Sequence, residues 1–169
     1  PLLKAFEKVD DVLRNAEQGI SELITVPGII NVDFADVRAI MEGAGTAVVG
    51  TGLGGGKERS LAAAKFAITS PLLETSIEGA RGILFSIAGG KDMRMSEIND
   101  AAKCITEAAD PSCKIIFGAY HDRRLKAGAV RVTVLAAGFS GLLSPRDESP
   151  ASTIDLFTET PDVQVRGAF

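Results

Sequence analysis

The chain has 169 residues, of which 46% are hydrophobic and 24% are charged, and its formal net charge is −4 at pH 7. This length and composition are those of a globular domain with a hydrophobic core. The acidic balance, the scattered basic residues and the absence of Trp argue against a nucleic-acid-binding protein. No apolar run approaches the ~20 residues that a membrane-spanning helix needs, so we expect no transmembrane segment.

The two cysteines, Cys104 and Cys113, are too few for a disulfide framework in a domain of this size. Neither has a second ligand at metal-binding spacing, so we expect ordinary structural thiols in a reducing compartment. The chain begins at Pro1 rather than at a Met, so we expect part of a longer protein or a processed form.

The first half of the chain alternates between helical and extended patterns. Hydrophobic residues recur every three or four positions over residues 2–23, which predicts one face of a long helix. The Val-Pro-Gly segment at 26–28 ends that helix and begins a loop. A short helix is expected over residues 34–42. The apolar, β-branched run over residues 46–52 predicts a buried strand, and the Ala-rich residues 58–69 predict a helix.

The second half completes a sheet. Strands are expected over residues 82–88, 114–120 and 129–137, and a helix over residues 95–109. The two β-α-β steps suggest a parallel pair of strands reached by a right-handed crossover. Because a short polar turn at 121–128 joins the last two strands, these should be antiparallel. We therefore predict an α/β (α+β) fold, with a mixed four-stranded sheet covered by helices and preceded by a long helix.

The domain organisation follows from these patterns. Residues 1–26 are expected to be the end of a long helix and residues 27–140 a compact domain. Residues 141–169 are polar, broken by proline and without periodicity, which predicts a disordered tail.

Two glycine motifs follow the first predicted strand. Gly50, Gly52 and Gly55 satisfy the G-x-G-x-x-G pattern, on which an alternative function, a dinucleotide-binding oxidoreductase, rests. No acidic residue ends a second strand about 20 positions later, as that site requires. Residues 52–57 also resemble a P-loop, but Glu58 stands where a Ser or Thr would hold Mg²⁺. We favour a flexible turn between strand and helix.

Asp33 and Asp36 stand three positions apart where the short helix should begin. In a structural interpretation, Asp33 is the N-cap, accepting a backbone N–H near Asp36, and Asp36 is favoured in the first turn by the helix dipole. In a functional interpretation, the same two carboxylates hold a water or a cation between them. Transfer of a γ-phosphoryl group to water needs mainly a positioned nucleophile, so ordinary carboxylates can serve when a metal ion is nearby. The two interpretations are compatible.

Residues 27–37, Pro-Gly-Ile-Ile-Asn-Val-Asp-Phe-Ala-Asp-Val, resemble the synergy loop of FtsZ, the tubulin-like division GTPase of bacteria and plastids. The resemblance covers about residues 1–140 and continues through residues 50–52, 70–73, 89–92 and 131–134. It implies the end of the family's central helix followed by its C-terminal domain, with a chorismate-mutase-like sheet.

The resemblance also implies an active site shared between subunits. GTP and Mg²⁺ would lie mainly on the amino-terminal domain of one subunit, and the synergy loop of the next would complete the site. Asp33 and Asp36 would orient the attacking water or its cation, and Asn31 would approach the γ-phosphate. The family's nucleotide signature, Gly-Gly-Gly-Thr-Gly-Thr-Gly, is absent from this chain. We therefore expect that this chain alone neither binds nor hydrolyses GTP.

The partners implied are further copies of the protein, joined head to tail in protofilaments, and other proteins of the division ring. A non-catalytic structural module of the same fold is the second function considered. Residues 109–119 resemble the plastid and cyanobacterial branch, which favours a plastid stroma over a bacterial cytoplasm. His121, the sole histidine, is expected to be a surface residue of the polar turn.

Overall fold

The computed structural model of the chain describes residues 2–45, 47–69 and 77–139. The predicted tail at 141–169 lies outside these ranges. The elements follow in the predicted order, and their bounds are α1 (Leu2–Thr25), α2 (Phe34–Met41), β1 (Ala47–Gly55), α3 (Arg59–Ile68), β2 (Gly82–Gly89), α4 (Met95–Ala108), β3 (Lys114–His121) and β4 (Ala129–Ala137).

The four strands form one mixed sheet in the order β1-β4-β2-β3. β2 and β3 are parallel, and β4 runs antiparallel to both of its neighbours, β1 and β2. The fold class predicted from the sequence is therefore confirmed, including the antiparallel last strand. The parallel pair is β2 with β3. β1 and β2 run in the same direction but are not paired, because β4 lies between them. β3 and β4 point in opposite directions, as expected, but they are not neighbours.

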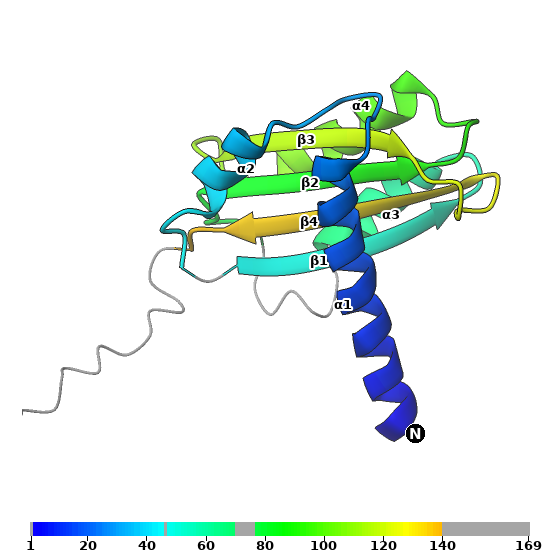
Figure 1. The fold of residues 1–169 in the computed structure, drawn as a ribbon, viewed down its shortest axis with the longest axis horizontal. Coiled ribbons are helices and arrows are strands. Elements are labelled where there is room, and N and C mark those ends of the chain that lie inside the picture. Colours follow the sequence, from blue (N-terminus) through cyan, green and yellow to red (C-terminus); the bar gives the residue numbers. More distant parts are fainter. Residues whose placement is uncertain (1, 46, 70–76, 140–169) are drawn as a thin grey trace, which may run out of the picture.

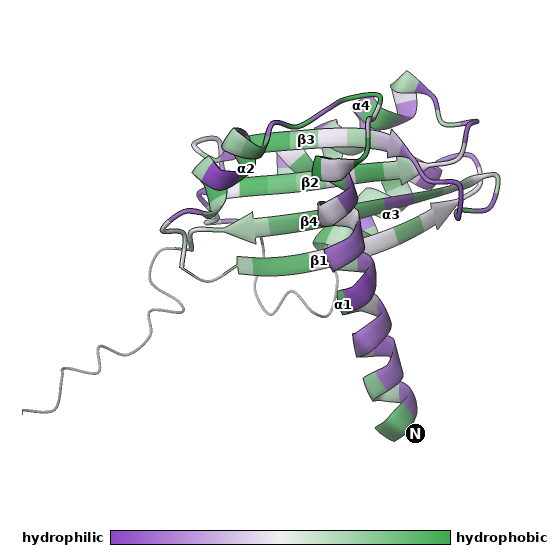
Figure 2. Ribbon diagram, in the orientation of Figure 1, coloured by the Kyte–Doolittle hydropathy of each residue, from purple (hydrophilic) through white to green (hydrophobic). Residues whose placement is uncertain are grey.

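The helices form layers on both faces of the sheet (Figure 1). α3 and α4 cover one face, and α1 and α2 lie on the other. α1 crosses the strands steeply, and its amino-terminal half projects beyond β1 at the edge of the sheet. Figure 2 shows the strands as largely hydrophobic, with hydrophilic residues along the projecting half of α1.

Alternation along the central strands assigns each residue to one face. On β4, Val130, Val132 and Val134 pack with α3 and α4, whereas Thr133 and Leu135 face α1 and α2. The larger hydrophobic core lies on the α3/α4 face. Its fully buried side chains include Ile83, Phe85, Ile87, Ile98 and Ile105. Because both faces are covered, β2 is buried along its whole length.

β1 differs from its prediction in position and length. The sequence predicted a buried strand over residues 46–52, but β1 lies at the edge of the sheet and continues to Gly55, with alternate residues exposed at its end. Of the glycines interpreted as a flexible turn, Gly52, Gly54 and Gly55 are part of this strand, and only Gly56, with a φ of 85°, lies in the turn that follows. A β-carbon on Gly52 would collide with the backbone of Ala63, and one on Gly54 with the backbone of Arg59. Gly52 and Gly54 therefore let α3 pack directly on β1, which gives Gly52 of the G-x-G-x-x-G pattern a packing role.

Candidate functional site: the loop between α1 and α2

The loop between α1 and α2 is held along the free edge of β3. α1 ends where the Val26 N–H donates to the Glu22 carbonyl at 2.9 Å. The Ile29 and Ile30 N–H groups both donate to the Ala119 carbonyl, at 2.8 and 3.1 Å, and the Ala119 N–H donates to the Ile30 carbonyl at 3.0 Å. This antiparallel bridge fixes the middle of the loop on the sheet.

Two glycines allow this close approach. A β-carbon on Gly28 would collide with the Ala119 carbonyl. A β-carbon on Gly118 would collide with Leu23 and lie within 3.0 Å of the Ile30 carbonyl oxygen. The end of α1 and the loop therefore pack directly against the backbone of β3. Asn31 stabilises the turn from within, since its Oδ1 accepts the Gly28 N–H at 2.7 Å.

Asp33 is the N-cap of α2, as the sequence predicted. Its Oδ1 accepts the Ala35 N–H at 3.1 Å, one residue earlier than expected, and its carbonyl accepts the Asp36 N–H at 3.0 Å. Asp36 lies in the first turn. Both carboxylates are exposed, and in the described parts of the chain only the cap hydrogen bond engages either of them.

The three predicted site residues, Asn31, Asp33 and Asp36, thus share one exposed stretch at the start of α2. Apolar side chains flank it, among them Ile29 and Phe34, which is 61% exposed. Within the described ranges, no three His, Cys, Asp or Glu side chains lie together as a metal site. The stretch can orient a water or share a cation with another molecule, but it does not enclose a ligand.

An ion network that the sequence analysis missed lies where β3 ends. Asp122, whose side chain is 2% exposed, accepts Arg124 Nε at 2.9 Å and Arg131 Nη2 at 2.8 Å. Arg124 Nη2 also pairs with Glu22, in the last turn of α1. Burial alone would raise the pKa of Asp122, but the hydrogen bonds and charges of Arg124 and Arg131 hold it below its usual value. The network joins the end of α1 to β3 and β4.

A second network stabilises the opposite face. The buried Arg59, at the start of α3, donates to Glu97 of α4 at 2.6 Å (Nε to Oε1) and at 2.9 Å (Nη2 to Oε2), and it also pairs with Asp92 through Nη1 at 2.5 Å. The hydrogen bonds from Arg59 lower the pKa values of both carboxyl groups, and these partners raise the pKa of Arg59. Gly128 N–H donates to Asp92 at 3.2 Å. These bonds join three loops at one end of the sheet.

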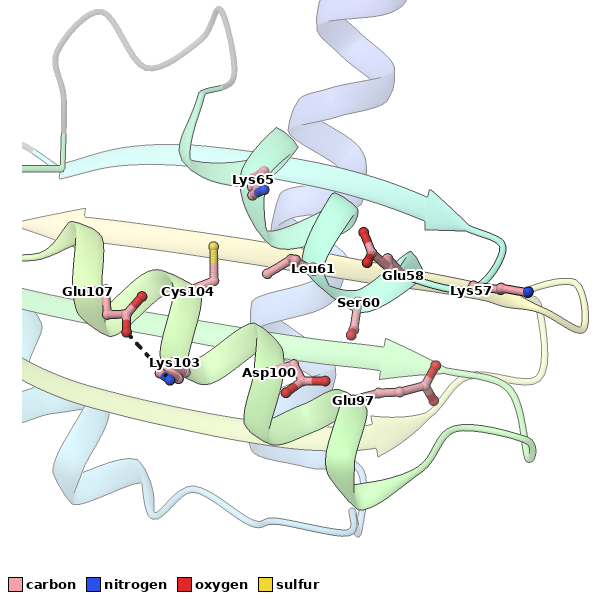
Figure 3. A pocket seen from close by; sticks show the side chains of 10 residues that line it. All are labelled: Lys57, Glu58, Ser60, Leu61, Lys65, Glu97, Asp100, Lys103, Cys104 and Glu107. Atoms are coloured by element: carbon pink, nitrogen blue, oxygen red, sulfur yellow. Dashed lines mark ion pairs between the residues drawn. The ribbon is translucent and has the colours of Figure 1, made fainter.

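A hollow of about 510 Å³ lies between α3 and α4 (Figure 3). Its walls mix lysines with carboxylates, and Lys103 is already paired with Glu107 at 3.8 Å. Burial raises the pKa of the Cys104 thiol, so it is a poor nucleophile. The hollow therefore offers no converging set of reactive groups.

The remaining predicted features are structural. Cys104 and Cys113 are free thiols. His121 is exposed, and its Nδ1 lies 3.0 Å from the Gly90 carbonyl oxygen. Of the helices in the described ranges, none has the length and apolar character needed to cross a membrane.

Comparison with known proteins gives this architecture a family. Among solved structures, an FtsZ dimer of M. jannaschii, solved empty, is 40% identical with a TM-score of 0.76; the match covers 82% of this chain and 40% of that one. The CetZ1 protein of Haloferax volcanii, a GDP-bound monomer, is 20% identical with a TM-score of 0.64, over 83% of this chain and 42% of that one. The chain thus spans about 40% of the length of these relatives.

The sequence itself matches the C-terminal domain of the FtsZ family over residues 45–140, which is more than half of the chain. This match includes all four strands and the two helices on the α3/α4 face. On both grounds, the chain belongs to the FtsZ family, whose C-terminal domain it contains.

Proposed function

We propose that this chain supplies the activating side of a GTP hydrolysis site whose nucleotide is held by the next subunit of a filament. The FtsZ family is a family of GTPases. The observation that supports a role in hydrolysis is the loop, which β3 holds in place while the carboxylates of Asp33 and Asp36 face outward. A rigid loop suits the reaction, because phosphoryl transfer to water depends mainly on positioning.

In this proposal each polar side chain of the loop has one task. Asp33 and Asp36 accept hydrogen bonds from the attacking water and orient it, or hold a cation that does so. Asn31 uses its Oδ1 within the loop, which leaves its amide N–H groups to donate to the γ-phosphate. Mg²⁺, bound mainly by the nucleotide and the amino-terminal domain, would neutralise phosphate charge. The two carboxylates then approach the phosphates without strong repulsion.

The surroundings of the loop support docking on a second subunit. The exposed apolar side chains of Ile29 and Phe34 border the acidic stretch, Met41 is exposed at the far end of α2, and all three would be buried in a head-to-tail contact. The FtsZ relative solved as a dimer supports self-association in this family. The projecting half of α1 exposes Leu2 and Phe6, which we assign to packing against the amino-terminal domain, as the end of a central helix.

A non-catalytic structural module is the second candidate. The apolar border of the loop favours it, because docking requires those side chains but does not require the carboxylates. The two functions differ in one measurement. A catalytic chain stimulates phosphate release from an amino-terminal FtsZ domain loaded with GTP, whereas a structural module binds that domain without stimulating release.

Replacement of Asp33 by Ser separates the cap from the chemistry. Ser retains an N-cap oxygen, so we expect the unfolding free energy to change by less than about 0.5 kcal/mol. Loss of the carboxylate should reduce phosphate release in the mixture about 100-fold or more. Asp33→Ala is the matched control, and it should lose both the turnover and about 1 kcal/mol of stability. Equal losses of stability and turnover in Asp33→Ser would support a purely structural Asp33.

We propose that the protein acts at a division ring. The resemblance of residues 109–119 supports a division ring in a plastid stroma, and a bacterial cytoplasm is the alternative. Other division-ring proteins would be partners in either compartment.

A further inference from the structure

The loop that carries Asn31, Asp33 and Asp36 is tied to the end of β3 at two places. The first is the backbone bridge between Ile30 and Ala119. The second lies before the loop, where Arg124 pairs with Glu22. Glu22 also supplies the carbonyl that closes the last turn of α1, by accepting the Val26 N–H. The position of this turn sets the direction in which the loop leaves the helix.

Arg124 is itself held on the sheet side of this contact. Its backbone N–H, its Nε and its Nη2 all donate to the carboxylate of Asp122, at 3.0, 2.9 and 3.1 Å. Asp122 is fixed in turn by Arg131 and by its own N–H, which donates to the Gly89 carbonyl at 2.9 Å. The negative charges of the Glu22 and Asp122 carboxylates balance the positive charges of Arg124 and Arg131. The guanidinium of Arg124 is therefore a fixed hydrogen-bond donor to α1.

The ion pair between Arg124 and Glu22 should contribute little to the free energy of unfolding. The Arg124 side chain is 52% exposed, and ion pairs open to solvent contribute little because water screens them. Its geometric consequence is larger. The apolar contacts of α1 around Leu23 fill space, but they are non-directional, whereas a salt bridge to a fixed guanidinium specifies one position of the last turn.

We propose that Arg124 is a positioning residue for the synergy loop, acting through Glu22 on the last turn of α1. The inference rests on the proposed function for its effect on turnover, but its effect on the loop itself is independent of that function. Removing the contact should leave the fold and the apolar docking border in place. It should release the end of α1, so that Asp33 and Asp36 are presented in many orientations rather than one.

The test compares Arg124→Ala with Arg123→Ala, in the 169-residue chain. Arg123 is the matched control, because it is the neighbouring residue, carries the same charge, is exposed and has no ion pair with any described residue. The first readout is amide hydrogen exchange of Ile29 and Ile30 in the chain alone. We expect about tenfold faster exchange in Arg124→Ala, and wild-type rates in Arg123→Ala, since both amides bond to Ala119 only while the loop stays seated.

The second readout is GTP turnover after mixing with a GTP-loaded amino-terminal FtsZ domain. Arg124→Ala should lower the maximal turnover about tenfold, with an unchanged half-saturating concentration of the chain. It also removes the Nε and Nη2 bonds to the buried Asp122, so its unfolding midpoint should fall, whereas Glu22→Gln keeps those bonds and should leave the midpoint almost unchanged. Glu22→Gln should reproduce the loss of turnover. The double variant should be no worse than either single one, because both remove the same contact.

Three results would overturn the inference. These are wild-type exchange rates in Arg124→Ala, a loss of turnover in Glu22→Gln that matches a fall in its unfolding midpoint, and additive losses of turnover in the double variant. If the wild-type mixture shows no turnover, the proposed function fails, and the exchange rates alone then decide whether Arg124 positions the loop.

Discussion

The two faces of the sheet differ in how they are filled. The α3/α4 face is a continuous apolar cluster, with Phe85 and Phe117 stacked at a ring-centroid distance of 5.0 Å. The α1/α2 face has fewer buried apolar residues. Ser86 and Thr133 lie there beneath Gly19 of α1, whose missing side chain leaves room for them.

The α3/α4 face mainly stabilises the fold, whereas the α1/α2 face positions the loop between α1 and α2. The α1/α2 face contains buried polar atoms without a described hydrogen-bond partner, the Tyr120 hydroxyl and Thr133 Oγ1. Such atoms lower stability, and the apolar α3/α4 face offsets that loss. The face that holds the loop therefore has the smaller apolar core and the unpartnered polar atoms, and elements that bind or move usually come from such less stable regions. Substitutions on the two faces should have different consequences.

The largest expected effect is on the α3/α4 face, at Gly54. Gly54→Ala would place a β-carbon against the backbone of Arg59, so α3 must move away from β1. We expect a loss of at least about 3 kcal/mol of unfolding free energy, measured by urea denaturation. Gly55→Ala is the matched control on the same strand, because its nearest neighbour, the Gly128 carbonyl oxygen, lies 4.0 Å away. Equal effects of the two changes would show that backbone crowding is not the cause.

A smaller loss is expected from Arg59→Ala. This change leaves Glu97, whose side chain is 16% exposed, without its guanidinium partner. Asp92 reaches solvent more easily, so we expect about 2 kcal/mol, below the range for a fully buried pair. Arg38→Ala is the control, since Arg38 and Glu42 are exposed and 3.6 Å apart on one helix, and it should change stability by less than about 0.5 kcal/mol. An effect at Arg38 as large as at Arg59 would contradict this ranking.

The smallest expected effect is a difference between the wild type and Asp122→Asn in how the free energy of unfolding depends on pH. The pKa of Asp122 is lowered in the folded chain, so its ionised form stabilises the fold above the ordinary carboxyl range of about 4. That contribution disappears as the pH falls through the folded pKa. Between pH 6 and pH 3, wild-type stability should therefore fall more steeply than that of Asp122→Asn, as measured by urea denaturation. Parallel curves would exclude a role for the Asp122 charge.

Local patterns predicted most of the fold. The bounds of β4 agree with the sequence to the residue, because a mostly apolar run rich in β-branched residues, between a polar turn and Gly138, has few alternatives. The strand order could not be predicted in this way. Alternation along a strand shows which face each residue occupies, but it does not identify the neighbouring strand. The placement of β4 between β1 and β2 depends on contacts between residues far apart in the sequence.

In the candidate site, too, local features could be predicted from the sequence and contacts between distant residues could not. Asp33 could be assigned as a cap because a cap is local, and its spacing from Asp36 is visible in the sequence. The network around Asp122 joins residues as distant as Glu22 and Arg124, and no local pattern relates them. The signal that was available is weaker: a polar turn in which an Asp precedes an Arg by two positions. The end of β1 was missed because glycines that serve helix packing have the sequence pattern of a turn.

The order β1-β4-β2-β3 also has a consequence for how the chain folds during synthesis. β4 is the last of the four strands to leave the ribosome, yet β1 has no partner in the sheet until β4 arrives. β2 and β3 can pair earlier, because they are parallel neighbours joined through α4. Nascent chains that end before residue 129 would expose β1 as an unpaired strand, and such strands promote aggregation. Closure of the sheet should therefore be a late and slow step, set by pairing between residues as distant as Ala47 and Ala137.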